Sequence, residues 1–139
     1  MFSRVLVPVD FSEKCRRSLD IAVNIASRYE GSIDLLHVIE TLVDTEYSEL
    51  ESFYRKLERE ALKDMDDLVA PYRDGTVDIH TDILFGSRSL EILNYAQQRN
   101  AGLIIMNSHA VDINQSAQGW GTISYKVALL SQCPVMLVK

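Results

Sequence analysis

Short runs of apolar residues alternate along the chain with longer segments in which apolar residues recur every three or four positions. The runs are rich in Val, Ile and Leu, as in strands covered on both faces, and the longer segments have the periodicity of a helix with one buried face. The predicted strands cover residues 4–9, 32–38, 77–83, 102–106 and 134–138, and the predicted helices begin near Ser12, Ser48, Leu90 and Thr122. Strands that alternate with helices require right-handed crossovers. We therefore predict one α/β domain over residues 1–139, with an open five-stranded parallel sheet and helices on both faces.

The third predicted strand differs from the others because polar residues alternate with its apolar ones. Asp78, His80 and Asp82 stand between the apolar positions of residues 77–83. Such alternation indicates that one face of the strand is exposed, which places this strand at an edge of the sheet. His80, on the polar side, is interpreted as a surface residue rather than a ligand.

Several helix ends and faces carry recognisable signals. Ser12 is expected to cap the first helix, with Glu13 in the first turn, where a negative charge suits the helix dipole. Gly31 is expected to take the left-handed conformation that commonly ends a helix. The long helix that begins near Ser48 has a charged face, which we interpret as a solvated surface; a partner-binding surface is the alternative.

Composition limits the compartment and the partners that we expect. The net charge of −6 argues against nucleic-acid binding, which needs clustered Lys and Arg. Cys15 and Cys133 lie far apart and lack the spacing of a metal site, so both are expected to be reduced thiols, and no metal is predicted. The sequence has no signal-peptide pattern and no apolar stretch close to the roughly 20 residues of a membrane span. We therefore expect a cytoplasmic protein without membrane contact.

Candidate chemistry lies at two predicted strand ends. In open parallel sheets, ligands bind beyond the carboxyl ends of the strands, where the strand order reverses. Asp10 follows the first strand, and Asn107, Ser108 and His109 follow the fourth. A helix that begins at Thr122 would direct free backbone N–H groups at this crevice, and such a helix end binds phosphate without needing a positive side chain.

Several segments match the pattern of one known family in order and in spacing. They are VPVDFSE at residues 7–13, LHV at 36–38, Gly86, LIIMNSH at 103–109, GTISYKV at 121–127 and CPVMLV at 133–138. On these segments the whole chain resembles the universal stress proteins. The resemblance implies a Rossmann-like, adenine-nucleotide-hydrolase-like fold with the strand order 3-2-1-4-5, which agrees with an edge position for the third strand.

The universal stress proteins that the chain resembles fall into two classes, which differ in nucleotide binding. Some members of the family bind ATP through a loop of the pattern G-x2-G-x9-G-[ST], and others lack this loop and hold no nucleotide. Here Asn107 and Ala110 occupy the first two glycine positions, ten residues instead of nine separate Ala110 from Gly121, and only Gly121-Thr122 matches outright. Glycine serves where φ is positive or a phosphate approaches closely, and Ala in a left-handed conformation costs about 1–2 kcal/mol. We therefore expect weak adenine-nucleotide binding or none.

The resemblance also implies which residues would line an adenine-nucleotide pocket, with Asp10 accepting ribose hydroxyls. Three of these residues have simpler readings: Asp10 as the start of the turn into the first helix, His109 as a packing residue, and Thr122 as a helix N-cap. The candidate nucleotide-binding residues are Pro8, Val9, Asp10, Val38, Met106, Asn107, His109, Ala110, Gly121, Thr122 and Ile123.

No catalytic residue is assigned. Ser108 and His109 are adjacent in sequence, which rarely lets one activate the other, and the chain has neither a G-x-S-x-G nor a Walker motif. We predict that the protein is not an enzyme, or at most a very slow ATPase. Two hypotheses remain: a stress-response module that acts through protein contacts with little or no nucleotide, and a regulatory switch that binds ATP or AMP in the same pocket.

The last predicted strand is short and apolar, and the implied order places it at the second edge of the sheet. An exposed apolar edge invites pairing with another chain. The resemblance implies a two-fold homodimer in which the last strands pair antiparallel, a contact that closes on itself. The alternative is that residues 107–121 cover this edge. The candidate interface residues are Val135, Met136, Leu137 and Val138.

Overall fold

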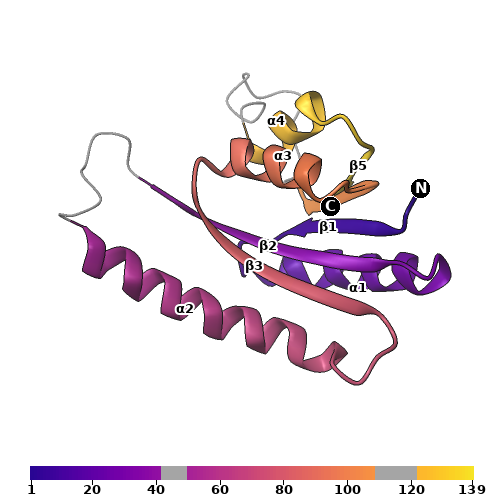
Figure 1. Cartoon of the computed structure of the whole chain (residues 1–139), viewed down its shortest axis with the longest axis horizontal. Helices are drawn as coiled ribbons and strands as arrows, with labels where there is room; N and C mark the ends of the chain where they lie inside the picture. The colour runs from indigo at the N-terminus through magenta and orange to yellow at the C-terminus, as the bar shows by residue number, and fades with distance from the viewer. Residues whose placement is uncertain (42–49, 109–121) are drawn as a thin grey trace.

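The computed structural model describes residues 1–41, 50–108 and 122–139, and strands alternate with helices along them (Figure 1). The strands are β1 (Arg4–Pro8), β2 (Ser32–Glu40), β3 (Asp78–Gly86), β4 (Leu103–Asn107) and β5 (Val135–Val138). The helices are α1 (Lys14–Arg28), α2 (Glu51–Val69), α3 (Arg88–Gln98) and α4 (Ile123–Leu130), and a short 3-10 helix, η2 (Ala70–Tyr72), follows α2. Every predicted strand and helix is present, with ends shifted by a few residues.

The sheet is parallel throughout and has the order β3-β2-β1-β4-β5. This confirms the predicted fold class and the strand order that the family resemblance implies. The edge positions of β3 and β5 are confirmed as well. The strand order reverses between β1 and β4, so the carboxyl ends of these two strands mark the place where a sheet of this kind binds a ligand.

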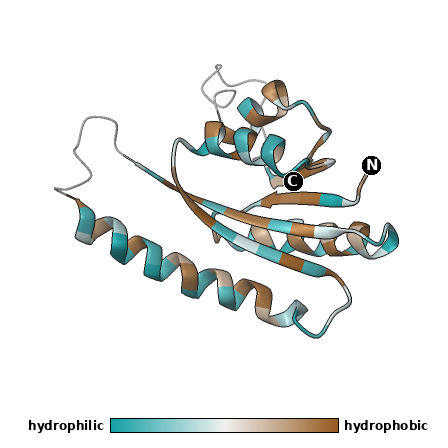
Figure 2. Ribbon diagram, viewed as in Figure 1, coloured by the Kyte–Doolittle hydropathy of each residue, from teal (hydrophilic) through white to brown (hydrophobic). Residues whose placement is uncertain are grey.

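Alternate residues of the central strands fill two hydrophobic cores, one on each face of the sheet. Val5 and Val7 of β1 pack with residues of α1 and α2, whereas Leu6 of β1 and Ile104 of β4 pack with residues of α3 and α4. Figure 1 shows the helices on the two faces, and Figure 2 shows the hydrophobic stretches along the central strands. Burial on both faces explains why these strands form continuous apolar runs in the sequence.

The start of α1 differs from the prediction. The N-cap position belongs to Glu13, which makes no side-chain cap, and not to Ser12. The Ser12 N–H donates to Asp10 Oδ1 at 3.0 Å, and the Ser12 carbonyl accepts from the Cys15 N–H at 3.0 Å. Because the Asp10 side chain bonds to the backbone two residues on, it forms a local turn that competes with a serine cap.

The end of α1 also corrects a prediction. The residue with the left-handed conformation is Glu30, with φ of 50°, and the N–H of Gly31 then donates to the Ala26 carbonyl at 2.8 Å. Gly31 is a glycine for a different reason, since a Cβ there would lie 2.7 Å from the Phe2 carbonyl oxygen. The glycine therefore permits a close approach between the start of β2 and the residues that lead into β1.

A buried charge fixes α3 against β2. Asp34 of β2 is 2% exposed and accepts hydrogen bonds from Arg99 Nη2 at 2.8 Å and Nε at 3.3 Å. Arg99 directly follows α3. A buried carboxylate needs such a partner, and the pair fixes one end of α3 so that its N-terminus lies over the carboxyl end of the sheet.

The described ranges contain no helix that combines the length and the apolar character of a membrane span. Cys15 is buried, Cys133 is half-buried, and both are free thiols.

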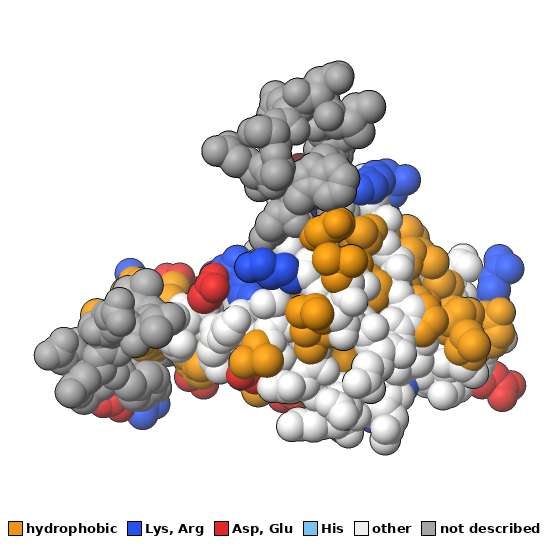
Figure 3. Space-filling view, turned by 90° about the horizontal axis from the view of Figure 1, so that it is seen from above, with side chains coloured by type: hydrophobic (Ala, Val, Ile, Leu, Met, Phe, Trp, Pro, Cys, Tyr) orange, Lys and Arg blue, Asp and Glu red, His pale blue; other side chains and the backbone are white. Residues whose placement is uncertain are grey.

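The β5 edge exposes only part of the predicted interface. Val138 is buried in the core beside α1, and Val135 and Leu137 pack against the core beside α3 and α4. Figure 3 looks onto the side of the molecule that carries α3 and α4, and shows hydrophobic side chains gathered there. The exposed apolar side chains of β5 and of the end of α4 are Met136 at 38%, Leu129 at 66% and Leu130 at 66%.

Candidate functional site

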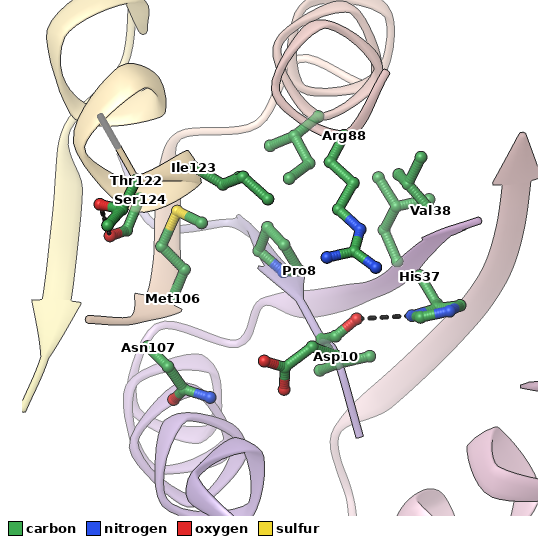
Figure 4. A pocket seen from close by; sticks show the side chains of 13 residues that line it. Pro8, Asp10, His37, Val38, Arg88, Met106, Asn107, Thr122, Ile123 and Ser124 are labelled. Carbon is green, nitrogen blue, oxygen red and sulfur yellow. Dashed lines mark hydrogen bonds between the residues drawn. The ribbon is translucent and has the colours of Figure 1, made fainter. Parts of the chain in front are cut away.

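A pocket of about 380 Å³ opens at the carboxyl ends of β1, β2 and β4, between the N-termini of α3 and α4 (Figure 4). It lies where the strand order reverses, as the sequence predicts. Apolar walls with a few convergent polar groups are typical of sites for small molecules. The residues that line the pocket are Pro8, Val9, Asp10, Leu36, His37, Val38, Arg88, Ile92, Met106, Asn107, Thr122, Ile123 and Ser124.

The topology brings most of the predicted site residues together. They come from β1, β2, β4 and the start of α4, which are far apart in sequence and meet only because the strands are parallel. The predicted residues that line the pocket are Pro8, Val9, Asp10, Val38, Met106, Asn107, Thr122 and Ile123. The other three candidates, His109, Ala110 and Gly121, lie outside the described residues.

Asp10 begins the turn into α1, which confirms the simpler reading of this residue, and it also lines the pocket, while its contact with ribose hydroxyls stays a prediction. Its Oδ1 accepts hydrogen bonds from the Ser12 N–H and from the Cys15 thiol, each at 3.0 Å. Burial raises the pKa of Asp10, but the hydrogen bonds from Cys15 and Ser12 outweigh burial and hold the pKa below the ordinary value of 3.8. The carboxylate is therefore ionised at neutral pH. Within the part of the chain that the structure describes, Oδ2 has no hydrogen-bond partner, so it can accept from a ligand hydroxyl.

Asn107 uses its side chain to hold β4 against the first turn of α1. The amide is best satisfied with its oxygen accepting from the Cys15 N–H at 3.1 Å and its nitrogen donating to the Lys14 carbonyl at 2.9 Å. The Ser18 hydroxyl also contacts this amide. Asn107 is a residue of β4 without positive φ, so its backbone does not require glycine. The asparagine serves the packing of α1, a contact that glycine at this position cannot make.

His37 is a pocket residue to which the sequence analysis assigned no role. Its Nδ1 lies 2.8 Å from the Val9 carbonyl, so Nδ1 carries the proton and donates, and its ring lies 4.4 Å from the Phe11 ring between centroids. Burial lowers the pKa of His37 below 6.5, the Val9 hydrogen bond partly opposes this, and the nearby Arg88 charge lowers it further. His37 is therefore neutral at pH 7 and presents Nε2 as an acceptor.

Arg88 is the charged lining residue that sequence reasoning missed. It is the first residue of α3, and its guanidinium points into the pocket toward Asp10 and His37 (Figure 4). Its Nε lies 3.8 Å from Glu40 Oε2, at the end of β2, which runs two residues beyond its predicted end at residue 38. The sequence does contain a signal for Arg88, because this residue follows the carboxyl end of β3 and ligands bind beyond the carboxyl ends of parallel strands. Only the ends of the first and fourth strands were considered as candidates.

Thr122 is the N-cap of α4, which confirms the simpler reading of this residue. Its Oγ1 accepts from the Tyr125 N–H at 3.4 Å and lies 3.2 Å from the Ser124 hydroxyl oxygen. Both side chains line the pocket, so the N-terminus of α4 faces it. The positive end of a helix dipole favours a negative group at this place.

The pocket therefore combines an acceptor at Asp10, a donor at Arg88 and a helix N-terminus, an arrangement suited to recognition of a small polar ligand. Among the residues that the structure describes, no group of three or more His, Cys, Asp or Glu side chains is placed to hold a metal ion.

Comparison with known proteins gives a consistent assignment. The model of the universal stress protein family matches residues 1–139. Universal stress protein YxiE of Bacillus subtilis is 28% identical, with both chains covered completely. Among solved structures, the hypothetical protein MJ0577 is 28% identical with a TM-score of 0.80, over 100% of this chain and 96% of the other.

Two further structures of the same fold were solved with a nucleotide. One is a universal stress protein in complex with cAMP, 21% identical with a TM-score of 0.65 over 99% of this chain and 96% of the other. The other is the universal stress protein from Archaeoglobus fulgidus in complex with dAMP, 18% identical with a TM-score of 0.72 over the full length of both chains. At these identities the likeness establishes the fold alone. The match of the family model over the entire sequence is stronger, and on it the chain belongs to the universal stress protein family.

Proposed function

We propose that the protein is a cytoplasmic, homodimeric stress-response module of one domain, residues 1–139, with a degenerate adenine-nucleotide pocket that binds ATP weakly or not at all. The observation that carries the proposal is the pocket itself, in which Asp10, Val38 and Thr122 meet at the point where the strand order reverses. The complexes of two family members with cAMP and dAMP support an adenine nucleotide as the ligand class.

Weak ATP binding follows from the phosphate side of the pocket. Ala110 stands where ATP-binding members have the second glycine of the loop, and ten residues instead of nine separate it from Gly121. The Asn107 amide bonds to α1 and does not itself obstruct a phosphate. The nucleoside side keeps an apolar wall and an ionised carboxylate at Asp10. We therefore expect the protein to gain little affinity from the second and third phosphates of ATP.

Isothermal titration with AMP and ATP tests this proposal. We expect AMP to bind with a dissociation constant on the order of 10 µM or weaker, and ATP to bind no more tightly than AMP. Asp10→Asn should weaken AMP binding about tenfold, since a hydrogen bond to a charged acceptor contributes about 1.5–3 kcal/mol. Asp67→Asn, on the exposed side of α2, is the matched control and should change nothing. A submicromolar dissociation constant for ATP would refute the proposal.

The second candidate function is a regulatory switch that holds ATP or AMP tightly in the same pocket. The N-terminus of α4 favours it, because Thr122 and Ser124 place a helix end against the pocket. Denaturing the purified protein and separating the released small molecules by chromatography discriminates between the two. One equivalent of ATP or AMP would establish the switch, and an empty chromatogram would favour the weak-binding module.

Multiple-turnover ATP hydrolysis is not part of the proposal. Asp10 is the one acidic side chain among the described lining residues, and metal-assisted attack of water on a phosphate normally needs further metal-binding carboxylates. An ATPase activity that persists through purification and disappears in Asp10→Ala would contradict this point.

A further inference from the structure

Groups that favour anions stand at both ends of the pocket. At one end lie the N-terminus of α4 and the hydroxyl groups of Thr122 and Ser124. At the other end lies Arg88, the first residue of α3, with its guanidinium directed into the pocket (Figure 4). A helix N-terminus attracts a negative group, and a guanidinium can bind a phosphate through two parallel hydrogen bonds. Each end therefore suits a phosphate group of its own.

Arg88 is available to a ligand because the fold makes little use of its charge. Among the described residues it forms a single ion pair, in which its Nε lies 3.8 Å from Glu40 Oε2. The two side chains are 41% and 56% exposed, so solvent screens this pair and it adds little stability. Glu40 does not line the pocket, whereas Arg88 does. The pair also uses Nε, and it leaves the two Nη groups for a phosphate.

Between the two ends lies Asp10. It follows β1, and β1 stands between β2 and β4 in the sheet, so the Asp10 carboxylate separates the Arg88 side of the pocket from the Thr122 side (Figure 4). An ionised carboxylate repels a phosphate and accepts a hydrogen bond from a hydroxyl group. The arrangement thus suits a ligand that has a hydroxyl group at its centre and a negative group on each side.

The ribose of a nucleotide can form such a centre when it carries one phosphate on the 5′ side and another on the 2′ or 3′ side. In ADP and ATP the phosphates extend as one chain from the 5′ oxygen, so they lie on one side only. We infer that Arg88 is a specificity-determining residue that makes the pocket prefer adenine nucleotides with a phosphate on each side of the ribose, such as adenosine 3′,5′-bisphosphate, over AMP and ADP. This preference rests on the proposed function of the pocket as an adenine-nucleotide site, and it holds whichever phosphate lies at the α4 end.

Isothermal titration with adenosine 3′,5′-bisphosphate, ADP and AMP tests the inference. We expect the wild-type protein to bind the bisphosphate at least about tenfold more tightly than AMP, which is the size of a hydrogen bond between charged groups. ADP has the same number of phosphates on one side of the ribose and should bind like AMP. Arg88→Gln should bind the bisphosphate and AMP equally. Arg59→Gln removes the same charge from an exposed position of α2, and this control should keep the wild-type preference.

Three results would overturn the inference and leave the nucleotide site standing. The first is a wild type that binds AMP as tightly as the bisphosphate. The second is ADP that binds as tightly as the bisphosphate, because the number of phosphates and not their placement would then decide affinity. The third is an Arg88→Gln variant that keeps the full preference, because the second phosphate would then bind elsewhere. Binding of no nucleotide by a wild type with a folded circular dichroism spectrum would remove the site and the inference together.

Discussion

Asp10 serves the fold and the pocket with different oxygen atoms. Oδ1 organises the turn between β1 and α1 through Ser12 and Cys15, whereas Oδ2 makes no hydrogen bond within the described ranges and, under the proposed function, accepts from the ligand. A carboxylate already fixed by two hydrogen bonds loses little freedom when it binds, which favours recognition over a flexible contact. The same residue explains why the predicted Ser12 cap is absent.

His37 should make stability depend on pH in a defined range. Because its pKa in the folded protein lies below the unfolded value of 6.5, the unfolded state binds the proton first. The contribution of His37 to the free energy of unfolding is therefore fully present above pH 6.5. It is lost as the pH falls from 6.5 toward the pKa of His37 in the folded protein. We expect the free energy of unfolding of the wild type to fall between pH 7 and pH 5, measured by urea denaturation.

The variant His37→Asn keeps a side-chain donor for the Val9 carbonyl and removes the titration. Its unfolding free energy should fall less steeply with decreasing pH than that of the wild type, whatever its absolute value. Thr81→Asn, at an exposed position of β3, is the control for a surface substitution that removes no titratable group, and it should keep the wild-type slope. Equal slopes in all three proteins would show that His37 does not carry this dependence.

At the residue scale, the sequence predicts side chains that follow buried strands but does not predict their partners. Asp10 and Thr122 were found because each stands at the boundary of a clear element. His37 was missed because its position depends on contacts with Val9 and Phe11 that the sequence does not contain. Arg88 follows the carboxyl end of β3, but its direction depends on a long β2 and on the turn at Gly86. That turn takes φ of 146°, and a Cβ at Gly86 would lie 2.9 Å from the Glu91 side chain. Neither feature shows in the hydrophobic pattern.

At the scale of elements, the α1–β2 connection distinguishes two uses of glycine. Gly31→Ala should lower stability by about 1–3 kcal/mol, because the new Cβ would lie 2.7 Å from the Phe2 carbonyl oxygen. Glu30→Gly should leave stability unchanged or raise it by less than about 1 kcal/mol, since glycine removes the left-handed strain at φ of 50° but loses more backbone entropy on folding. Thermal denaturation of both variants checks the pair. The reverse order of effects would restore Gly31 as the left-handed residue.

The elements themselves were predictable because both faces of the central strands are buried. The apolar runs located β1 and β4, and Thr122 as a helix start located α4, to within a residue or two. The ends of β2 and β3 were harder, because the two strands pair along their full length up to Glu40 and Gly86. This pairing is a tertiary contact that a local pattern does not contain.

At the scale of the whole molecule, the proposed homodimer depends on the β5 edge. Val135 and Leu137 pack against the monomer's own core, so charges at these positions would disturb folding as well as association. Met136 is 38% exposed and gives a cleaner test. Met136→Lys should convert a dimer into a monomer in sedimentation equilibrium without changing the circular dichroism spectrum.

A control for this prediction is Phe53→Lys on α2, where an apolar side chain of similar exposure, 51%, lies away from the edge strand. This variant should remain dimeric. A wild type that sediments as a monomer at tens of micromolar would contradict the dimer and support the alternative that residues 107–121 cover the edge.

The strand order was available from the family resemblance. The inward direction of the Val138 side chain was not, because it depends on the register of β5 on β4.

The most direct test of the central claim is an NMR titration of the isotopically labelled protein with AMP, followed through backbone amide signals. A nucleotide in the proposed pocket should shift the signals of Asp10, Val38, Arg88 and Ile123, which come from distant parts of the sequence and meet only there. Signals at the other end of the sheet, such as those of Ser32 and Asp78, should stay unchanged. Saturable shifts confined to the pocket residues are the result that we predict. No shifts at millimolar nucleotide, or shifts centred on another surface, would contradict the account.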